Sequence, residues 1–230
     1  MAALASATEV LDLSCSLCSL RKEKRFCLAV HGRICPQCCG QQREVTLDCP
    51  SECPYLQQAR QHEKPRDFAD IPADEVFPEI DLAEQFLHDR EALIAGVLET
   101  LCKLARSNRD LHDREIIRAL ANLARSYQTL IASGLVYQEP LANPAQQMII
   151  DTIRNLLQEF REVEHKHLGH TTLRDSDVLK TLVFLLRLAN LHTSGRPLSR
   201  GFVDFLNTRF AELPASPDAA TGPASRIIMP

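Results

Sequence analysis

The sequence of 230 residues contains no tryptophan, and aromatic residues make up only 5% of it. A core built mainly from large aromatic rings is therefore excluded, and packing has to come from leucine, isoleucine and alanine. Apolar residues still account for 45% of the chain and charged residues for 24%, which is typical of a globular protein with a real core. This composition favours helices that pack through aliphatic side chains.

Long apolar runs are also missing. The best window, residues 178–191, is interrupted by Lys180 and Arg187, so no segment reaches the roughly 18 apolar residues that cross a bilayer. The first 13 residues carry no Lys or Arg and contain Glu9 and Asp12, unlike a secretory signal peptide. We therefore expect a cytoplasmic protein without a membrane span, in a compartment that keeps thiols reduced.

The familiar catalytic motifs are absent: there is no G-x-S-x-G, no P-loop, no glycine-rich dinucleotide fingerprint and no H-E-x-x-H. One cluster resembles a catalytic metal site, namely Glu162, Glu164, His165, His167 and His170. His165 and His167, however, would point about 200° apart on a helix. Histidines at a helix C-terminus also interact favourably with the helix dipole. We therefore predict that the protein is not an enzyme.

Cysteine is abundant in one stretch only. Eight of the nine cysteines lie between Cys15 and Cys53, in the order C-x2-C-x8-C-x3-H-x3-C-x2-C-C-x9-C-x3-C. In a reducing compartment, clustered thiols at such short spacings indicate metal binding rather than disulfides. Four pairs of residues are spaced so that one turn of the chain can supply two metal ligands. These pairs are Cys15/Cys18, Cys27/His31, Cys35/Cys38 and Cys49/Cys53.

Four ligand pairs predict two zinc ions, because Zn²⁺ takes four nitrogen or sulfur ligands in a tetrahedron. If the first and third pairs share one ion, the loops interleave and stabilise a module that is too small for a core of its own. Sequential pairing is the alternative, and Cys39 is an alternative ligand to His31. A filled ligand shell leaves no position for an activated water, so the zinc is predicted to be structural.

Cys102 lies on an apolar helical stripe and is predicted to be a core residue.

The run from Cys15 to Cys38, with Phe26 before Cys27 and Ile34 before Cys35, resembles the B-box type of zinc finger. The resemblance implies a cross-braced module of two zinc ions that serves mainly in protein–protein contact. The matching ligand order is Cys15, Cys18, Cys27, His31, Cys35 and Cys38. The chain departs from the family at the last pair, Cys49-x3-Cys53, which follows a longer gap, and in the extra thiol of Cys39.

The function predicted from these features is that of an adaptor or regulator that binds another protein, with exposed loops at residues 21–25 and 41–43 as the recognition surface. Two alternatives remain open. The basic run Arg21, Lys22, Lys24 and Arg25 could contact nucleic acid, although deprotonated metal-bound thiols would offset its charge. A redox sensor built on Cys38 and Cys39 is the other alternative.

The rest of the sequence predicts an all-α helical bundle that follows the small N-terminal cysteine-rich zinc-binding module. The expected organisation is a lead-in at 1–14, the module at 15–63, a proline-rich linker at 64–80, the bundle at 81–213 and a disordered tail at 214–230. From about Asp81 the apolar residues repeat with a helical period, without the alternation of strands. This predicts four long helices and a short fifth one, and the expected cap residues are Asp110 or Asp113, Asn143 before Pro144, Asp175 or Ser176, and Ser199.

Overall fold

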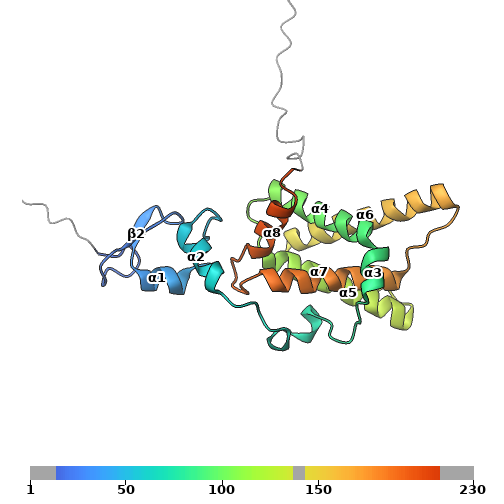
Figure 1. Cartoon of the computed structure of the whole chain (residues 1–230), viewed down its shortest axis with the longest axis horizontal. Helices are drawn as coiled ribbons and strands as arrows, with labels where there is room; N and C mark the ends of the chain where they lie inside the picture. The colour runs from blue at the N-terminus through green and yellow to red at the C-terminus, as the bar shows by residue number, and fades with distance from the viewer. Residues whose placement is uncertain (1–13, 137–142, 213–230) are drawn as a thin grey trace, which may run out of the picture. The chain divides into compact units, whose positions relative to one another are not determined.

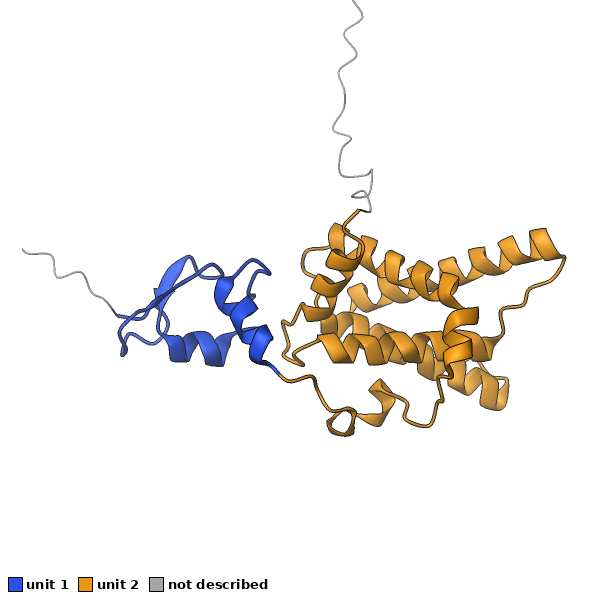
Figure 2. Ribbon diagram, viewed as in Figure 1, with its two compact units in different colours: residues 1–63 blue, residues 64–230 orange. Residues whose placement is uncertain are grey.

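The computed structural model describes residues 14–136 and 143–212. The chain divides into two compact units, residues 1–63 (unit 1) and residues 64–230 (unit 2) (Figures 1 and 2). The predicted tail, and all but the last residue of the predicted lead-in, lie outside the described residues. No helix in the described ranges combines the length and apolar character that crossing a membrane requires.

Unit 1 contains a short hairpin and two helices. The antiparallel strands are β1 (Arg25–Cys27) and β2 (Gly32–Ile34), and the helices are α1 (Pro36–Gln42) and α2 (Pro54–His62). Both helices begin with proline, whose fixed φ and missing N–H suit the first helical position. The sequence indicated a helix at 55–63 but neither the hairpin nor α1, because strands of three residues are too short to show an alternating pattern.

Cysteine forms most of the core of unit 1. Among the described residues, seven buried thiols pack with three buried aliphatic side chains, Ile34, Leu47 and Leu56, and the partly buried Leu28, Ala29 and Tyr55 pack against them. So few aliphatic contacts give little hydrophobic stabilisation, and domains of this size usually need cross-links or metal ions to fold.

Unit 2 is a helical bundle (Figure 1). Two short 3₁₀ turns, Phe68–Asp70 and Ala73–Glu75, precede it. Its helices are α3 (Glu84–Asp89), α4 (Glu91–Ser107), α5 (Asp113–Ser133), α6 (Pro144–Leu168), α7 (Asp175–His192) and α8 (Gly201–Arg209). The helix α5 packs against α6 and α7, and α4 packs against α6, α7 and α8. The core is aliphatic as predicted, and it includes Cys102, which is fully buried.

The first predicted helix of the bundle is two helices in the structure. The chain leaves helical geometry at Arg90, with φ −115° and ψ 18°, so that α3 ends at Asp89 and α4 begins at Glu91. The guanidinium of Arg90 contacts Asp177 at 2.7 Å and the carbonyl of Thr172 at 3.0 Å. The apolar stripe continues across this break, and for that reason the periodicity alone did not reveal it.

Candidate metal centre

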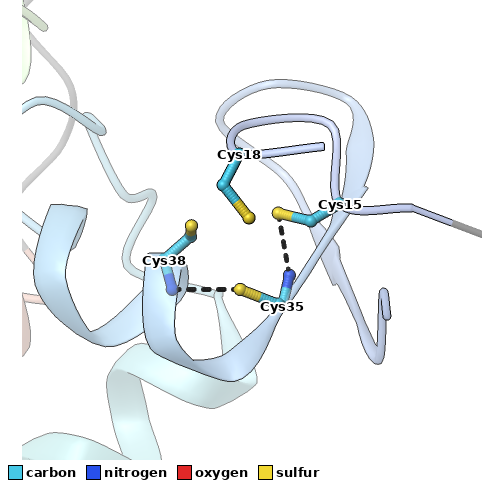
Figure 3. Close-up of side chains that lie close together, drawn as sticks. All are labelled: Cys15, Cys18, Cys35 and Cys38. Atoms are coloured by element: carbon cyan, nitrogen blue, oxygen red, sulfur yellow. Dashed lines mark hydrogen bonds between the residues drawn. The ribbon is translucent and has the colours of Figure 1, made fainter. Parts of the chain in front are cut away.

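Four cysteine side chains of unit 1 point toward a common centre (Figure 3). The sulfur atoms of Cys15, Cys18, Cys35 and Cys38 all lie within 4.8 Å of one another. Cys15 and Cys18 belong to the loop before β1, Cys35 precedes α1, and Cys38 lies in the first turn of α1. The structure thus brings together the first and third ligand pairs of the sequence, and not two consecutive pairs.

Backbone amides fix the positions of two of these sulfur atoms. The N–H of Cys35 donates to Sγ of Cys15 at 3.2 Å, and the N–H of Cys38 donates to Sγ of Cys35 at 3.4 Å. Cys15 and Cys35 have almost no exposed surface, Cys38 is also buried, and Cys18 is half-buried. The chain therefore holds the sulfur atoms of Cys15 and Cys35 in place from buried, hydrogen-bonded positions.

The pKa values of three thiols of the cluster, Cys15, Cys35 and Cys38, are shifted in different directions. Burial raises the pKa of Cys15, but hydrogen bonds from the backbone of Cys35, Cys18 and Leu17 outweigh burial and lower it to about 6. The pKa of Cys35 is also lowered, mainly by the backbone N–H of Cys38. The hydrogen bond with Cys35, together with burial, raises the pKa of Cys38 to about 12. Without a cation, the cluster therefore favours some thiolates and resists full ionisation.

One arginine faces this cluster. Nη1 of Arg21 lies 3.9 Å from Sγ of Cys18, and the hydrogen bond of its guanidinium with Cys35 raises the pKa of Arg21. The sequence placed Arg21 in a basic run that could contact a partner. The structure directs its charge at sulfur, where it offsets the negative charge of thiolates.

The cluster can hold a metal ion. A tetrahedral shell with metal–sulfur bonds of about 2.3 Å places its sulfur atoms about 3.8 Å apart, which is compatible with the observed grouping. Four sulfur donors suit soft or borderline metals, and four protein ligands complete a tetrahedral shell. The arrangement is therefore that of a closed site.

The other predicted ligands are placed differently. Cys27, Cys49 and Cys53 are buried in the same small core, whereas His31 is exposed in the hairpin turn with φ 48°. Burial raises the pKa of Cys49, the N–H of Glu44 lowers it, and the nearby Cys53 and Cys27 raise it further. In the described ranges, these residues do not form a second group of ligand atoms as close as the first.

Cys39, the alternative ligand, has arginine neighbours. Nη1 of Arg25 lies 3.4 Å from its sulfur atom and Nη2 of Arg43 lies 4.0 Å from it. The guanidinium of Arg25 also lies over the ring of Tyr55, 4.6 Å from its centroid. Sequence reasoning missed both contacts. Arg43 lies four residues after Cys39, a helical spacing that could have indicated its contact, whereas no local rule links Arg25 to a thiol fourteen residues away.

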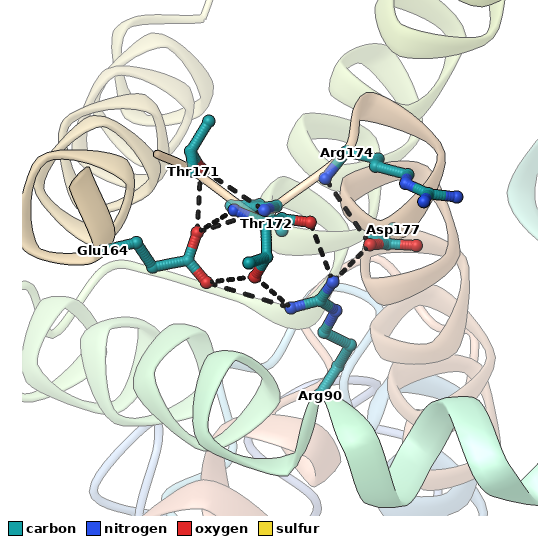
Figure 4. Close-up of polar contacts among 7 residues, drawn as sticks. Arg90, Glu164, Thr171, Thr172, Arg174 and Asp177 are labelled. Carbon is teal, nitrogen blue, oxygen red and sulfur yellow. Dashed lines mark hydrogen bonds and ion pairs between the residues drawn. The ribbon is translucent and has the colours of Figure 1, made fainter. Parts of the chain in front are cut away.

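Among the described residues, the histidine-rich end of α6 does not bring three ligand atoms as close together as the cysteine cluster does. His165, His167 and His170 are exposed. Glu164 instead accepts hydrogen bonds from the hydroxyls of Thr171 and Thr172 and from the N–H groups of Thr172 and Leu173 (Figure 4). This carboxylate fastens the connection between α6 and α7.

Comparison with protein-family models, with curated proteins and with solved structures gives no match to this chain.

Proposed function

We propose that unit 1 is a zinc-stabilised interaction module and that the protein acts as an adaptor or regulator by binding another protein. The observation that carries this proposal is the closed group of Cys15, Cys18, Cys35 and Cys38, with sulfur atoms within 4.8 Å of one another. Zinc with four cysteine ligands has no free position for substrate or water, so its role is structural. A reducing cytoplasm is the compartment in which these thiols stay available to metal.

We assign a second zinc ion to Cys27, Cys49 and Cys53, with His31 or Cys39 as the fourth ligand. The three thiols are buried in one core, and two of them lie close enough to perturb the pKa of the third. Uncharged thiols at such positions would only be small apolar groups, whereas a metal ion would join the hairpin to the segment before α2. Two ions in this arrangement would interleave the loops of the module and stabilise it.

The alternative functions have less support. Of the four cations between residues 21 and 25, Arg21 faces Cys18 and Arg25 faces Cys39. Of these four cations, only Lys22 and Lys24 have no such contact with a sulfur atom. Two lysines form a small cationic surface for phosphate binding. A thiol sensor would need the same cysteines, and zinc release on mild oxidation would be its sign.

The experiment that tests the proposal is elemental analysis of the full chain purified without added metal. We expect two zinc ions per chain, and about one in each of the Cys35→Ser and Cys49→Ser variants. Cys102→Ser is the matched control, because this thiol is buried in unit 2 and donates to the carbonyl of Leu206. The control should keep both ions. Iron in place of zinc, or no metal at all, would overturn the proposal.

A further inference from the structure

The solvent face of the hairpin carries an exposed aromatic ring between two cations. Phe26 of β1 is paired with Arg33 of β2, so their side chains lie on the same face. Lys24 and Phe26 are exposed, whereas the alternating residues are less so: Arg25 is half-buried and Cys27 is buried. Phe26 is 52% exposed, which is unusual for an aromatic residue in a chain with so few of them. We call Lys24, Phe26 and Arg33 the hairpin face.

The two edges of this hairpin differ. The carbonyl of Arg33 accepts from the N–H and the hydroxyl of Ser16, so the segment before β1 covers the outer edge of β2. The carbonyl of Ile34 accepts from the N–H of Lys24 and therefore faces β1. The carbonyl of Arg33 points away from β1, because it accepts from Ser16. Phe26 is the antiparallel partner of Arg33, and the two residues of such a pair direct their backbone groups either both toward or both away from each other, so the N–H and C=O of Phe26 point away from β2.

The outer edge of β1 is consequently open at Phe26. Among the backbone hydrogen bonds of the described residues outside the sheet itself, none involves Phe26. An open strand edge is a template for an additional extended segment, in which main-chain hydrogen bonds give affinity and side-chain contacts give specificity.

The charge of the hairpin face selects the partner. Lys24 is exposed, and Arg33 keeps 60% of its side chain exposed although its Nε contacts Glu23 at 2.7 Å. Two cations beside an aromatic ring complement a segment with acidic residues next to an apolar one. Nucleic acid fits less well, because the hairpin face offers one ring and two cations, and binding of single strands relies on several of each.

We propose that the hairpin face docks an extended acidic segment of a partner protein, which adds to the outer edge of β1 and places an apolar side chain on Phe26. This surface rests on the proposed function, since it specifies where the zinc-stabilised module would make its contact. Arg21 and Arg25, which the sequence grouped with Lys24, have no part in the surface because they face sulfur atoms.

The probe is a fluorescein-labelled peptide of eight residues in which aspartate and valine alternate, and its reference is the same peptide with lysine in place of aspartate. Fluorescence anisotropy is measured with the full zinc-loaded chain at low salt. We expect the acidic peptide to bind and the basic peptide to bind at least about tenfold more weakly. Phe26→Thr, which keeps a residue suited to a strand, should weaken binding of the acidic peptide by about tenfold. The double change Lys24→Glu and Arg33→Glu should reverse the preference.

Phe68→Ala is the matched control, because Phe68 is a partly exposed aromatic residue of unit 2, and it should bind like the wild type. The zinc content of every protein is measured alongside. Absence of binding by a wild type that holds two zinc ions would overturn the docking surface and leave the zinc module intact. A wild type without zinc would overturn the proposed function itself. Equal binding by Phe26→Thr, or displacement of the peptide by a thymidine oligonucleotide, would also overturn the acidic-segment assignment.

Discussion

The carboxylate of Asp113, the first residue of α5, caps the N-terminus of α8 by accepting from the N–H of Phe202 at 3.1 Å. It also accepts from the N–H of Val203 at 3.1 Å and from the hydroxyl of Ser199 at 2.8 Å. Asp113 is completely buried. One side chain therefore satisfies three buried donors and joins the start of one helix to the start of another.

Replacing Asp113 by alanine should destabilise unit 2 by about 3 kcal/mol, because buried donors would be left without an acceptor. Asp113→Asn keeps an acceptor oxygen and should cost less. Urea denaturation followed by circular dichroism measures the difference. Equal stability of wild type and Asp113→Ala would show that the cap makes no net contribution.

The pH dependence gives a second test of the same residue. Burial raises the pKa of Asp113 above its usual value of 3.8, although hydrogen bonds from Ser199, Val203 and Phe202 oppose this. The folded protein then binds a proton that the unfolded chain has already released. The contribution of Asp113 to stability should therefore decline as the pH rises from 3.8 to the folded pKa, and this decline should be absent in Asp113→Asn.

Glu164 should show the opposite pH dependence. Partial burial raises its pKa, but hydrogen bonds from Thr172, Thr171 and Leu173 outweigh burial and lower it to about 2 from 4.5. Its contribution is complete above pH 4.5 and should be lost as the pH falls toward 2. Glu164→Gln should lower stability at neutral pH by about 1 to 2 kcal/mol, because hydrogen bonds to a charged acceptor are stronger.

The control for Glu164 is Glu162→Gln, since Glu162 is exposed on the same helix and accepts a bond from the side chain of Gln158. Denaturation midpoints of both variants between pH 3 and pH 7 provide the comparison. Identical pH profiles for Glu164→Gln and the wild type would contradict the role assigned to this carboxylate.

These two carboxylates show where sequence reasoning succeeds and where it stops. Asn143 caps α6 with its side chain, and Gly134 and Gly169 end α5 and α6 with positive φ, as the local pattern indicated. Asp110 or Asp113 was expected to cap α5, but His112 occupies that position and Asp113 caps α8 instead. Glu164 was grouped with nearby histidines, but its partners lie beyond Gly169. Local chemistry is visible in a sequence, whereas a side chain's choice among distant donors depends on the folded arrangement.

The candidate metal centre also has features that the sequence predicted and features that it could not predict. Spacing identified Cys15, Cys18, Cys35 and Cys38 as ligand candidates, because short gaps are set by turn geometry. Spacing did not decide between sequential and interleaved pairs, since that choice depends on how the hairpin folds back. The contact of Arg25 with Cys39, fourteen residues away, was beyond reach for the same reason, whereas Arg21 and Arg43 lie three and four residues from the cysteines that they contact.

Glycine at position 201 is required by the close approach of α8 to the end of α7. A Cβ atom at this position would lie 2.1 Å from the carbonyl oxygen of His192, which no side-chain rotation can relieve. Gly201→Ala should therefore destabilise unit 2 by about 2 kcal/mol or more. Gly96→Ala is the control, because its Cβ would only touch Leu156 at 3.9 Å and alanine favours a helix interior. The control should be neutral or more stable by up to about 1 kcal/mol, and a melting temperature of Gly201→Ala equal to that of the wild type would contradict the steric argument.

Removal of metal should unfold unit 1 and leave unit 2 folded. The core of unit 1 consists largely of thiols, whereas the aliphatic core of unit 2 needs no ligand. A strong chelator at neutral pH should therefore abolish amide hydrogen-exchange protection in α1, α2 and the hairpin, and leave protection in α4, α5 and α7 unchanged. Exchange measured by mass spectrometry resolves the two units, and added zinc should restore the protection. Persistent protection of α1 after complete loss of metal would mean that the thiol core folds by itself, and the four sulfur atoms would then be a packed cluster rather than a structural metal site.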